Sequence, residues 1–106
     1  MIKEITATEL KLKKDNKEDF QLIDVREEFE FDIVNIGGEL IPISDILDNV
    51  SKISKFKPVI FYCRSGARSA NMVNVLERQF GFTNLYNLKG GIISYIDQID
   101  PTLTKY

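Results

Sequence analysis

The sequence predicts an α/β fold with a central, mainly parallel sheet of about four to five strands and helices on both faces. Short runs of strand character alternate with amphipathic stretches along the 106 residues, an order typical of parallel sheets with crossover helices. The runs at 22–23 and 59–61 are continuously apolar, as expected of strands buried on both faces. A hydrophobic content of 43% and a charged content of 28% fit one folded domain over residues 1–106.

Five short runs have the features of strands. Residues 59–62 are the clearest of them, because β-branched and aromatic side chains fit a pleated, buried surface. The run at 40–43 follows the Gly37-Gly38 turn and is brief, since a proline lacks the N–H that a central strand needs. The predicted strands are residues 2–5, 21–25, 40–43, 59–62 and 85–86.

Helical segments are predicted between and after these strands. Thr8 is the expected N-cap of the first helix, and Ser44 that of the third, in which apolar residues recur with helical spacing. Gly81 is the expected C-cap of the fourth, and Pro101 stops the last. The predicted helical segments are residues 9–15, 27–32, 44–54, 69–80 and 92–99.

The charge balance points away from nucleic acid and membranes as partners. The chain has 14 basic and 16 acidic residues, for a net charge of −2, which favours neither kind of partner. Its apolar runs are too short to span a bilayer, and its first residues lack the pattern of a signal segment. We therefore expect a cytoplasmic monomer.

A single cysteine and the absence of histidine restrict the chemistry. Cys63 has no second cysteine with which to form an internal disulfide. Without histidine, Ser/His/Asp catalysis, Cys/His catalysis and histidine metal sites are excluded, and a structural zinc site loses its usual ligands. We expect neither a metal nor an organic cofactor.

Cys63 stands at the predicted carboxyl end of a buried strand, before a short loop and a helix, where sites form in open α/β sheets. Small residues in the loop let successive backbone N–H groups turn inward, and the following helix adds its positive end. Such a cradle stabilises a thiolate, a persulfide or an anionic donor. The alternative is an inert core cysteine, but two loop arginines argue against it. The predicted cradle consists of Arg64, Ser65, Gly66, Ala67 and Arg68, with Ser69 at the helix start.

Four motifs in order resemble those of rhodanese domains and together cover about residues 3–100. The active-site loop corresponds to residues 63–69, and the final motif to the Gly90-Gly91 turn before the last helix. The second motif looks like that of rhodanese domains attached to activating enzymes of sulfur-carrier proteins. The four motifs are residues 22–27, 35–42, 63–69 and 88–92.

This resemblance implies a sulfurtransferase of the thiosulfate sulfurtransferase type. Cys63 would take the outer sulfur of thiosulfate or a related persulfide donor, and a thiol or cyanide would then remove it. The loop N–H groups would hold the resulting persulfide, while Arg64 and Arg68 would attract the donor. The covalent persulfide would be the only intermediate, with no cofactor involved.

Other functions stay open. The chain is alternatively a persulfide carrier or binding module that a partner enzyme loads within a sulfur relay, or a sensor domain with slow chemistry. Phosphatase or arsenate reductase activity is less favoured, because related phosphatases have a loop longer by one residue. Only four residues separate Cys63 from Arg68 here, and Ser69 falls at the position of the phosphatase arginine.

The sequence has three further informative features. Asp24 would act as a proton relay if it lay near Cys63, but we favour a structural role for Asp24 and Arg26. They would pair with loop groups to fix the turn after their strand or, since they share one strand face, with each other. Asn35 replaces a histidine that many members of the family carry in the second motif, and the effect of that replacement is open. Tyr95 stands where many members have tryptophan, which we expect to alter packing only.

Overall fold

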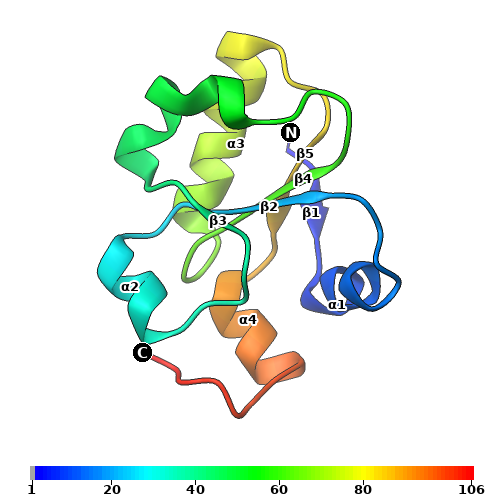
Figure 1. The fold of residues 1–106 in the computed structure, drawn as a ribbon, viewed down its shortest axis with the longest axis vertical. Helices are drawn as coiled ribbons and strands as arrows, with labels where there is room; N and C mark the ends of the chain where they lie inside the picture. The colour runs from blue at the N-terminus through cyan, green and yellow to red at the C-terminus, as the bar shows by residue number, and fades with distance from the viewer. Residues whose placement is uncertain (1) are drawn as a thin grey trace.

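The five strands form one parallel sheet in the order β1-β5-β4-β2-β3. The computed structural model, which describes residues 2–106, pairs every neighbouring strand in parallel (Figure 1). Parallel neighbours need crossover connections, and helical segments provide them. The α/β prediction is therefore confirmed. The strands are β1 (Glu4–Ile5), β2 (Gln21–Asp24), β3 (Glu39–Leu40), β4 (Val59–Tyr62) and β5 (Leu85–Leu88).

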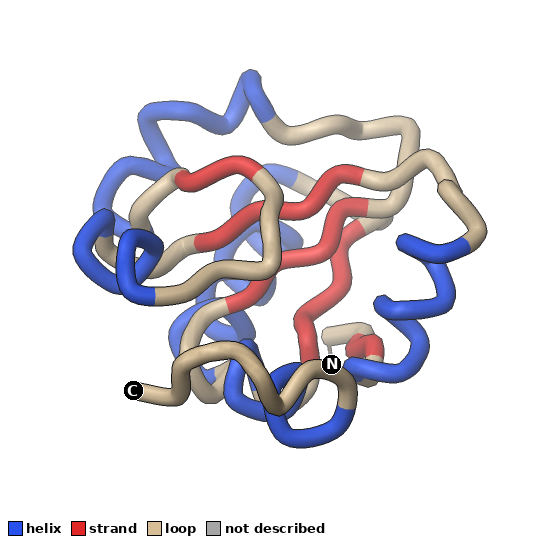
Figure 2. The backbone as a smooth tube through the Cα atoms, turned by 60° about the horizontal axis from the view of Figure 1, so that its bottom comes forward, coloured by secondary structure: helices blue, strands red, loops and turns tan. Residues whose placement is uncertain are grey.

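Helices cover both faces of the sheet, as predicted (Figure 2). Successive side chains of β4 point to opposite faces. Phe61 therefore packs in the core beneath α3 and η1, whereas Ile60 and Tyr62 pack beneath α1 and α4. The helices are α1 (Ala7–Asp15), α2 (Glu28–Ile33), the 3₁₀ segment η1 (Ile43–Lys52), α3 (Ala67–Phe80) and α4 (Gly91–Gln98). Among residues 2–106, no helix is both long and apolar enough to cross a bilayer.

The segment after the Gly37-Gly38 turn differs from the prediction. Only Glu39–Leu40 pairs as a strand, and Pro42 becomes the N-cap of η1. The N–H groups of Ile41 and Ile43 still donate to carbonyl oxygens at the end of β2, at 2.9 and 3.0 Å. Pro42 lacks an N–H, so the ladder cannot continue through it. The helix expected after Ser44 is 3₁₀ in character and kinks at Asn49.

Helix α1 begins two residues before the expected start, at Ala7, so the prediction that Thr8 is its cap is wrong. The Thr6 Oγ1 atom accepts from the Glu9 N–H at 3.1 Å, and Glu9 Oε1 accepts from the Thr6 N–H at 2.9 Å. This reciprocal capping box needs a Glu or Gln three residues after the cap. Thr6 has one in Glu9, whereas Thr8 is followed at that distance by Lys11.

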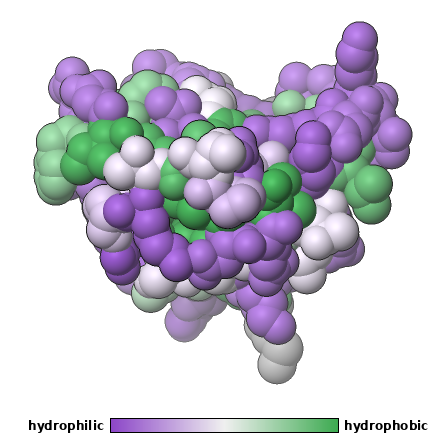
Figure 3. All heavy atoms as spheres, turned by 90° about the horizontal axis from the view of Figure 1, so that it is seen from below, coloured by the Kyte–Doolittle hydropathy of each residue, from purple (hydrophilic) through white to green (hydrophobic). Residues whose placement is uncertain are grey.

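Apolar surface is visible at the end of the molecule that holds α2, α4 and the C-terminal segment. Figure 3 looks onto this end and shows apolar side chains interrupted and surrounded by polar ones. The exposed apolar side chains include two from consecutive turns of α2, Phe29 and Ile33. Contact with another molecule would bury apolar surface at this end of the protein.

Removal of the capping hydroxyl should destabilise the protein, and the neighbouring threonine offers a matched control. Thr6→Ala should lower the free energy of unfolding by about 1 kcal/mol, because the Glu9 N–H loses its acceptor. Thr8→Ala should change it by less than about 0.5 kcal/mol, since Thr8 is an exposed residue inside the helix. Urea denaturation measures both. Equal losses from the two substitutions would contradict the assigned cap.

Candidate active site

The Cys63 sulfur lies directly after β4, at the carboxyl edge of the sheet. Its side chain is 1% exposed and packs with Ile23 and Val25 of the neighbouring strand region. The Sγ atom accepts hydrogen bonds from the backbone N–H groups of Gly66 at 3.2 Å and Ser69 at 3.4 Å. The sulfur of a buried cysteine thus has two backbone donors, an arrangement that favours negative charge on it.

Helix α3 starts at Ala67, two residues before the predicted start, so the loop itself is only Cys63–Gly66. Gly66 is the N-cap and has a left-handed backbone with φ of 98°. That conformation turns the chain directly into the helix, and glycine adopts it without a Cβ clash. Arg68 and Ser69 therefore belong to the first helical turn. The buried Ser69 lies on the sulfur side, whereas Ser65 and Ala67 are exposed.

Backbone hydrogen bonds from the first residues of α4 hold the loop in place. The N–H of Ile92 donates to the Cys63 carbonyl at 2.9 Å, and that of Ile93 to the Arg64 carbonyl at 3.1 Å. In a trans peptide the next N–H points the opposite way, so the Arg64 and Ser65 N–H groups turn away from α4. Within residues 2–106, the N–H groups of Arg64, Ser65, Ala67 and Arg68 donate to no protein atom. The loop and the first turn of α3 thus offer unused donors beside the sulfur.

Ser69 and Asn87 form a buried network beneath the loop. The Ser69 hydroxyl lies 2.5 Å from Asn87 Oδ1 on β5 and 3.4 Å from the Cys63 sulfur. Asn87 Nδ2 donates to the Gly66 carbonyl at 3.2 Å and to Glu4 Oε2 at 3.1 Å. Asn87 was not predicted from the sequence, although an amide between Tyr86 and Leu88 in a buried strand is a usable signal.

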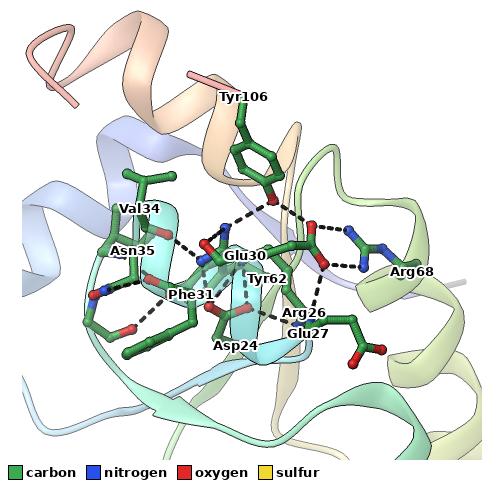
Figure 4. Close-up of polar contacts among 12 residues, drawn as sticks. Asp24, Arg26, Glu27, Glu30, Phe31, Val34, Asn35, Tyr62, Arg68 and Tyr106 are labelled. Atoms are coloured by element: carbon green, nitrogen blue, oxygen red, sulfur yellow. Dashed lines mark hydrogen bonds and ion pairs between the residues drawn. The ribbon is translucent and has the colours of Figure 1, made fainter. Parts of the chain in front are cut away.

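Arg68 is bound to a carboxylate. Its Nη1 and Nη2 atoms donate to the two oxygens of Glu30 on α2, at 2.9 and 3.0 Å. The Tyr106 hydroxyl also donates to Glu30, at 2.6 Å, and accepts from Arg26 at 3.0 Å (Figure 4). Hydrogen bonds from Arg68 are the largest cause that lowers the pKa of Glu30, to about 2. Neither Glu30 nor Tyr106 was predicted, because both lie far from the loop in sequence.

Asp24 and Arg26 pair with each other, as their shared strand face indicated. The Arg26 guanidinium donates to both Asp24 oxygens, with the shortest contact at 2.7 Å, and both side chains are fully buried. Arg26 also donates to the Val34 carbonyl at 2.7 Å and so connects β2 to the end of α2. The pair lies on the sheet face of Tyr62, opposite the face on which Cys63 packs.

The remaining predicted positions lie at the rim. Arg64 is exposed, and its Nε and Nη2 atoms donate to the backbone carbonyl of Tyr106, the former at 2.8 Å. Asn35 accepts from the Gly37 N–H at 3.0 Å and donates to the Phe31 carbonyl at 3.2 Å, so it shapes the turn after α2. No three metal-ligating side chains converge within the described part of the chain.

The turn at Gly91 should tolerate no side chain. A Cβ atom there would lie 2.4 Å from the Arg64 carbonyl oxygen and 2.6 Å from that of Cys63, at a φ of 63°. Gly91→Ala should therefore cost about 3 kcal/mol of stability and displace the loop. Gly81→Ala, at a similar φ but with open space around its Cβ, should cost about 1 kcal/mol. Denaturation curves compare the two, and equal costs would contradict the contact with the loop.

The Glu30 carboxylate should make stability depend on acid pH. Its folded pKa of about 2 is below the ordinary value of 4.5, so its contribution is present above pH 4.5 and disappears as the pH falls toward 2. Over this range the wild type should lose on the order of 2 to 3 kcal/mol more than Glu30→Gln, which has no such carboxyl group. Urea midpoints from pH 6 to pH 2.5 test this. Parallel curves for the two proteins would contradict it.

Comparison with known proteins identifies the family of this chain. Residues 6–98 match the rhodanese-like domain family. The chain is 35% identical to a putative sulfurtransferase of Bacillus subtilis, with 94% of this chain and 96% of that protein covered. It is also 36% identical to a sulfurtransferase of Allochromatium vinosum, with 90% and 89% covered.

Longer proteins and solved structures agree. The chain is 35% identical to a probable adenylyltransferase/sulfurtransferase of Mycobacterium tuberculosis, covering 96% of this chain but 26% of that protein. It thus spans about a quarter of the length of that relative. A rhodanese-like domain protein from Staphylococcus aureus superposes with a TM-score of 0.80 at 32% identity, covering 89% of this chain and 91% of that one. The chain therefore belongs to the rhodanese-like domain family.

Proposed function

We propose that this protein transfers a sulfane sulfur through a persulfide on Cys63. The observation that carries the proposal is the position of the sulfur among backbone N–H donors, with Gly66 and Ser69 already bound to it. Four more N–H groups nearby, those of residues 64, 65, 67 and 68, donate to no protein atom within residues 2–106. A ring of such donors stabilises negative charge on a second sulfur attached to the first. The names of the full-length relatives support sulfur transfer in general.

The proposed reaction has two displacements. The Cys63 thiolate attacks the outer sulfur of thiosulfate, a new S–S bond forms, and sulfite leaves with the electron pair of the bond that breaks. The enzyme then holds a persulfide whose outer sulfur bears the charge. Cyanide or a thiolate attacks that sulfur, and the Cys63 thiolate leaves. Each step exchanges one sulfur bond for another, which divides the transfer into two easier reactions.

The arginines would act on the donor from the rim of the loop. Arg64 is exposed, and an arriving anion would compete with the Tyr106 carbonyl for its guanidinium. Arg68 would contribute less attraction, because Glu30 already balances its charge. Backbone N–H groups would therefore provide most of the binding of the transferred sulfur, with Arg64 as the main cation for an anionic donor.

A persulfide carrier is the second candidate. Relatives named adenylyltransferase/sulfurtransferase combine the two activities in longer chains and support a partner in a sulfur relay. The apolar surface at the α2 end, with Phe29 64% exposed, gives such a protein partner a place to contact. In that role a partner enzyme would load Cys63, and turnover with thiosulfate would be incidental.

Persulfide loading tests the proposal directly. Wild type incubated with thiosulfate should gain the mass of one sulfur atom, and cyanide should release it as thiocyanate. Cys63→Ser should do neither, and Cys63 is the only cysteine in the chain, so no other thiol contributes. Intact-mass spectrometry and a thiocyanate assay measure the two steps.

Parallel incubation with a cysteine desulfurase and cysteine separates the two candidates. Loading by the desulfurase alone would favour the carrier over the thiosulfate enzyme. Absence of a persulfide under both conditions, with a free and reactive thiol, would contradict sulfur transfer altogether.

A further inference from the structure

The Ser69 hydroxyl has one proton and three acceptors within reach. Its oxygen lies 2.5 Å from Asn87 Oδ1, 3.3 Å from the Gly66 carbonyl oxygen and 3.4 Å from the Cys63 sulfur. A hydroxyl donates one good hydrogen bond at a time, and the shortest of these contacts is by far the strongest. The proton therefore points at Asn87, away from the sulfur.

The orientation of the Asn87 amide follows from its other contacts. Its nitrogen lies 3.2 Å from the Gly66 carbonyl oxygen and 3.1 Å from a carboxylate oxygen of Glu4, both of which are acceptors only. A flipped amide would place its oxygen against these two oxygens and its nitrogen toward the hydroxyl. The amide oxygen thus faces Ser69, and both side chains are buried, with 1% of Asn87 and none of Ser69 exposed.

We propose that Asn87 is a positioning residue that determines how much of Cys63 is thiolate at a given pH. Because Asn87 holds the Ser69 proton, the Ser69 oxygen presents a lone pair to the sulfur and accepts a hydrogen bond from the Cys63 thiol. The thiol form gains this bond, whereas the thiolate keeps the backbone N–H groups of Gly66 and Ser69 and the nearby charge of Arg68, which Glu30 partly balances. For the hydroxyl to stabilise the thiolate, it must rotate and give up its 2.5 Å bond to Asn87.

This inference deepens the proposed function and rests on it, since the thiolate is the form that would attack the sulfur donor. Asn87 would restrain that attack in the unloaded protein. Once the persulfide has formed, Sγ is bonded to a second sulfur and carries no proton, so the lone pair of Ser69 has no thiol to stabilise. Asn87 would thus act on the loading step and not on the discharge step.

The pH profile of Cys63 alkylation tests this role through a double-mutant cycle. Iodoacetamide reacts with the thiolate, and Cys63 is the only cysteine. Asn87→Ala should free the hydroxyl for the sulfur, move the midpoint of the profile to lower pH and raise the rate at pH 7 about fivefold. In the Ser69→Ala background the same substitution should change the rate less than twofold, because no hydroxyl remains to be freed.

Ser69→Ala alone keeps the test decisive even where loss of the Asn87 amide prevents folding. Ser69→Ala removes the acceptor of the thiol hydrogen bond, so this variant should alkylate about two- to threefold faster than wild type at pH 7, whereas Ser44→Ala, at an exposed serine on η1, should leave the rate unchanged. A Ser69→Ala rate equal to or below that of wild type would overturn the proposal, because the hydroxyl would then not favour the thiol form. So would an Asn87→Ala effect that persists without Ser69.

Failure of the proposed function is detected separately. Persulfide loading by thiosulfate is followed by intact mass in wild type and in each variant. If no protein loads while the alkylation cycle gives the expected pattern, sulfur transfer is wrong but the role of Asn87 toward the thiol stands. If wild type loads and the cycle fails, sulfur transfer stands and the role of Asn87 is wrong.

Discussion

The geometry of the site depends first on two hydrogen bonds that the start of α4 donates to carbonyl oxygens of the loop. Ile92 and Ile93 donate to the carbonyls of Cys63 and Arg64 and so fix the orientation of both peptide planes. Only with those planes fixed do the following N–H groups turn away from α4. The contact also requires glycine at position 91, where any Cβ would meet the two carbonyl oxygens. The last motif of the chain therefore shapes a loop that precedes it by more than twenty residues.

A second constraint is the balance of buried charge around the loop. Asp24, Arg26, Glu30 and Arg68 alternate in sign and are connected through the Tyr106 hydroxyl. Among the described residues no buried polar side-chain atom lacks a partner, and these hydrogen bonds offset part of the cost of removing the charges from water. The balance has a chemical cost, because Glu30 cancels much of the charge that Arg68 would otherwise offer a donor. Neutral N–H dipoles, and not free cations, are thus the main feature of the cradle.

The sequence predicted those parts of the site that are local. Cys63 and its loop follow one strand directly, and the pairing of Asp24 with Arg26 follows from the two-residue period of a strand. Glu30, Asn87 and Tyr106 come from other segments, and no local pattern joins them to the loop. The start of α3 was misplaced for a physical reason, since a left-handed Gly66 caps the helix without the side-chain signal by which N-caps are recognised.

The absence of histidine from the chain is consistent with this chemistry. In the proposed reaction a sulfur atom would move from the donor to Cys63 and on to the acceptor as negative charge shifts along the sulfurs, and neither displacement would need a proton to be given or taken. A general base would matter only for removal of the thiol proton before the first attack. Backbone N–H groups lower the cost of that step, and the Ser69–Asn87 hydrogen bond opposes it. These two sets of uncharged groups, acting in opposite directions, would then determine how readily Cys63 loses its proton.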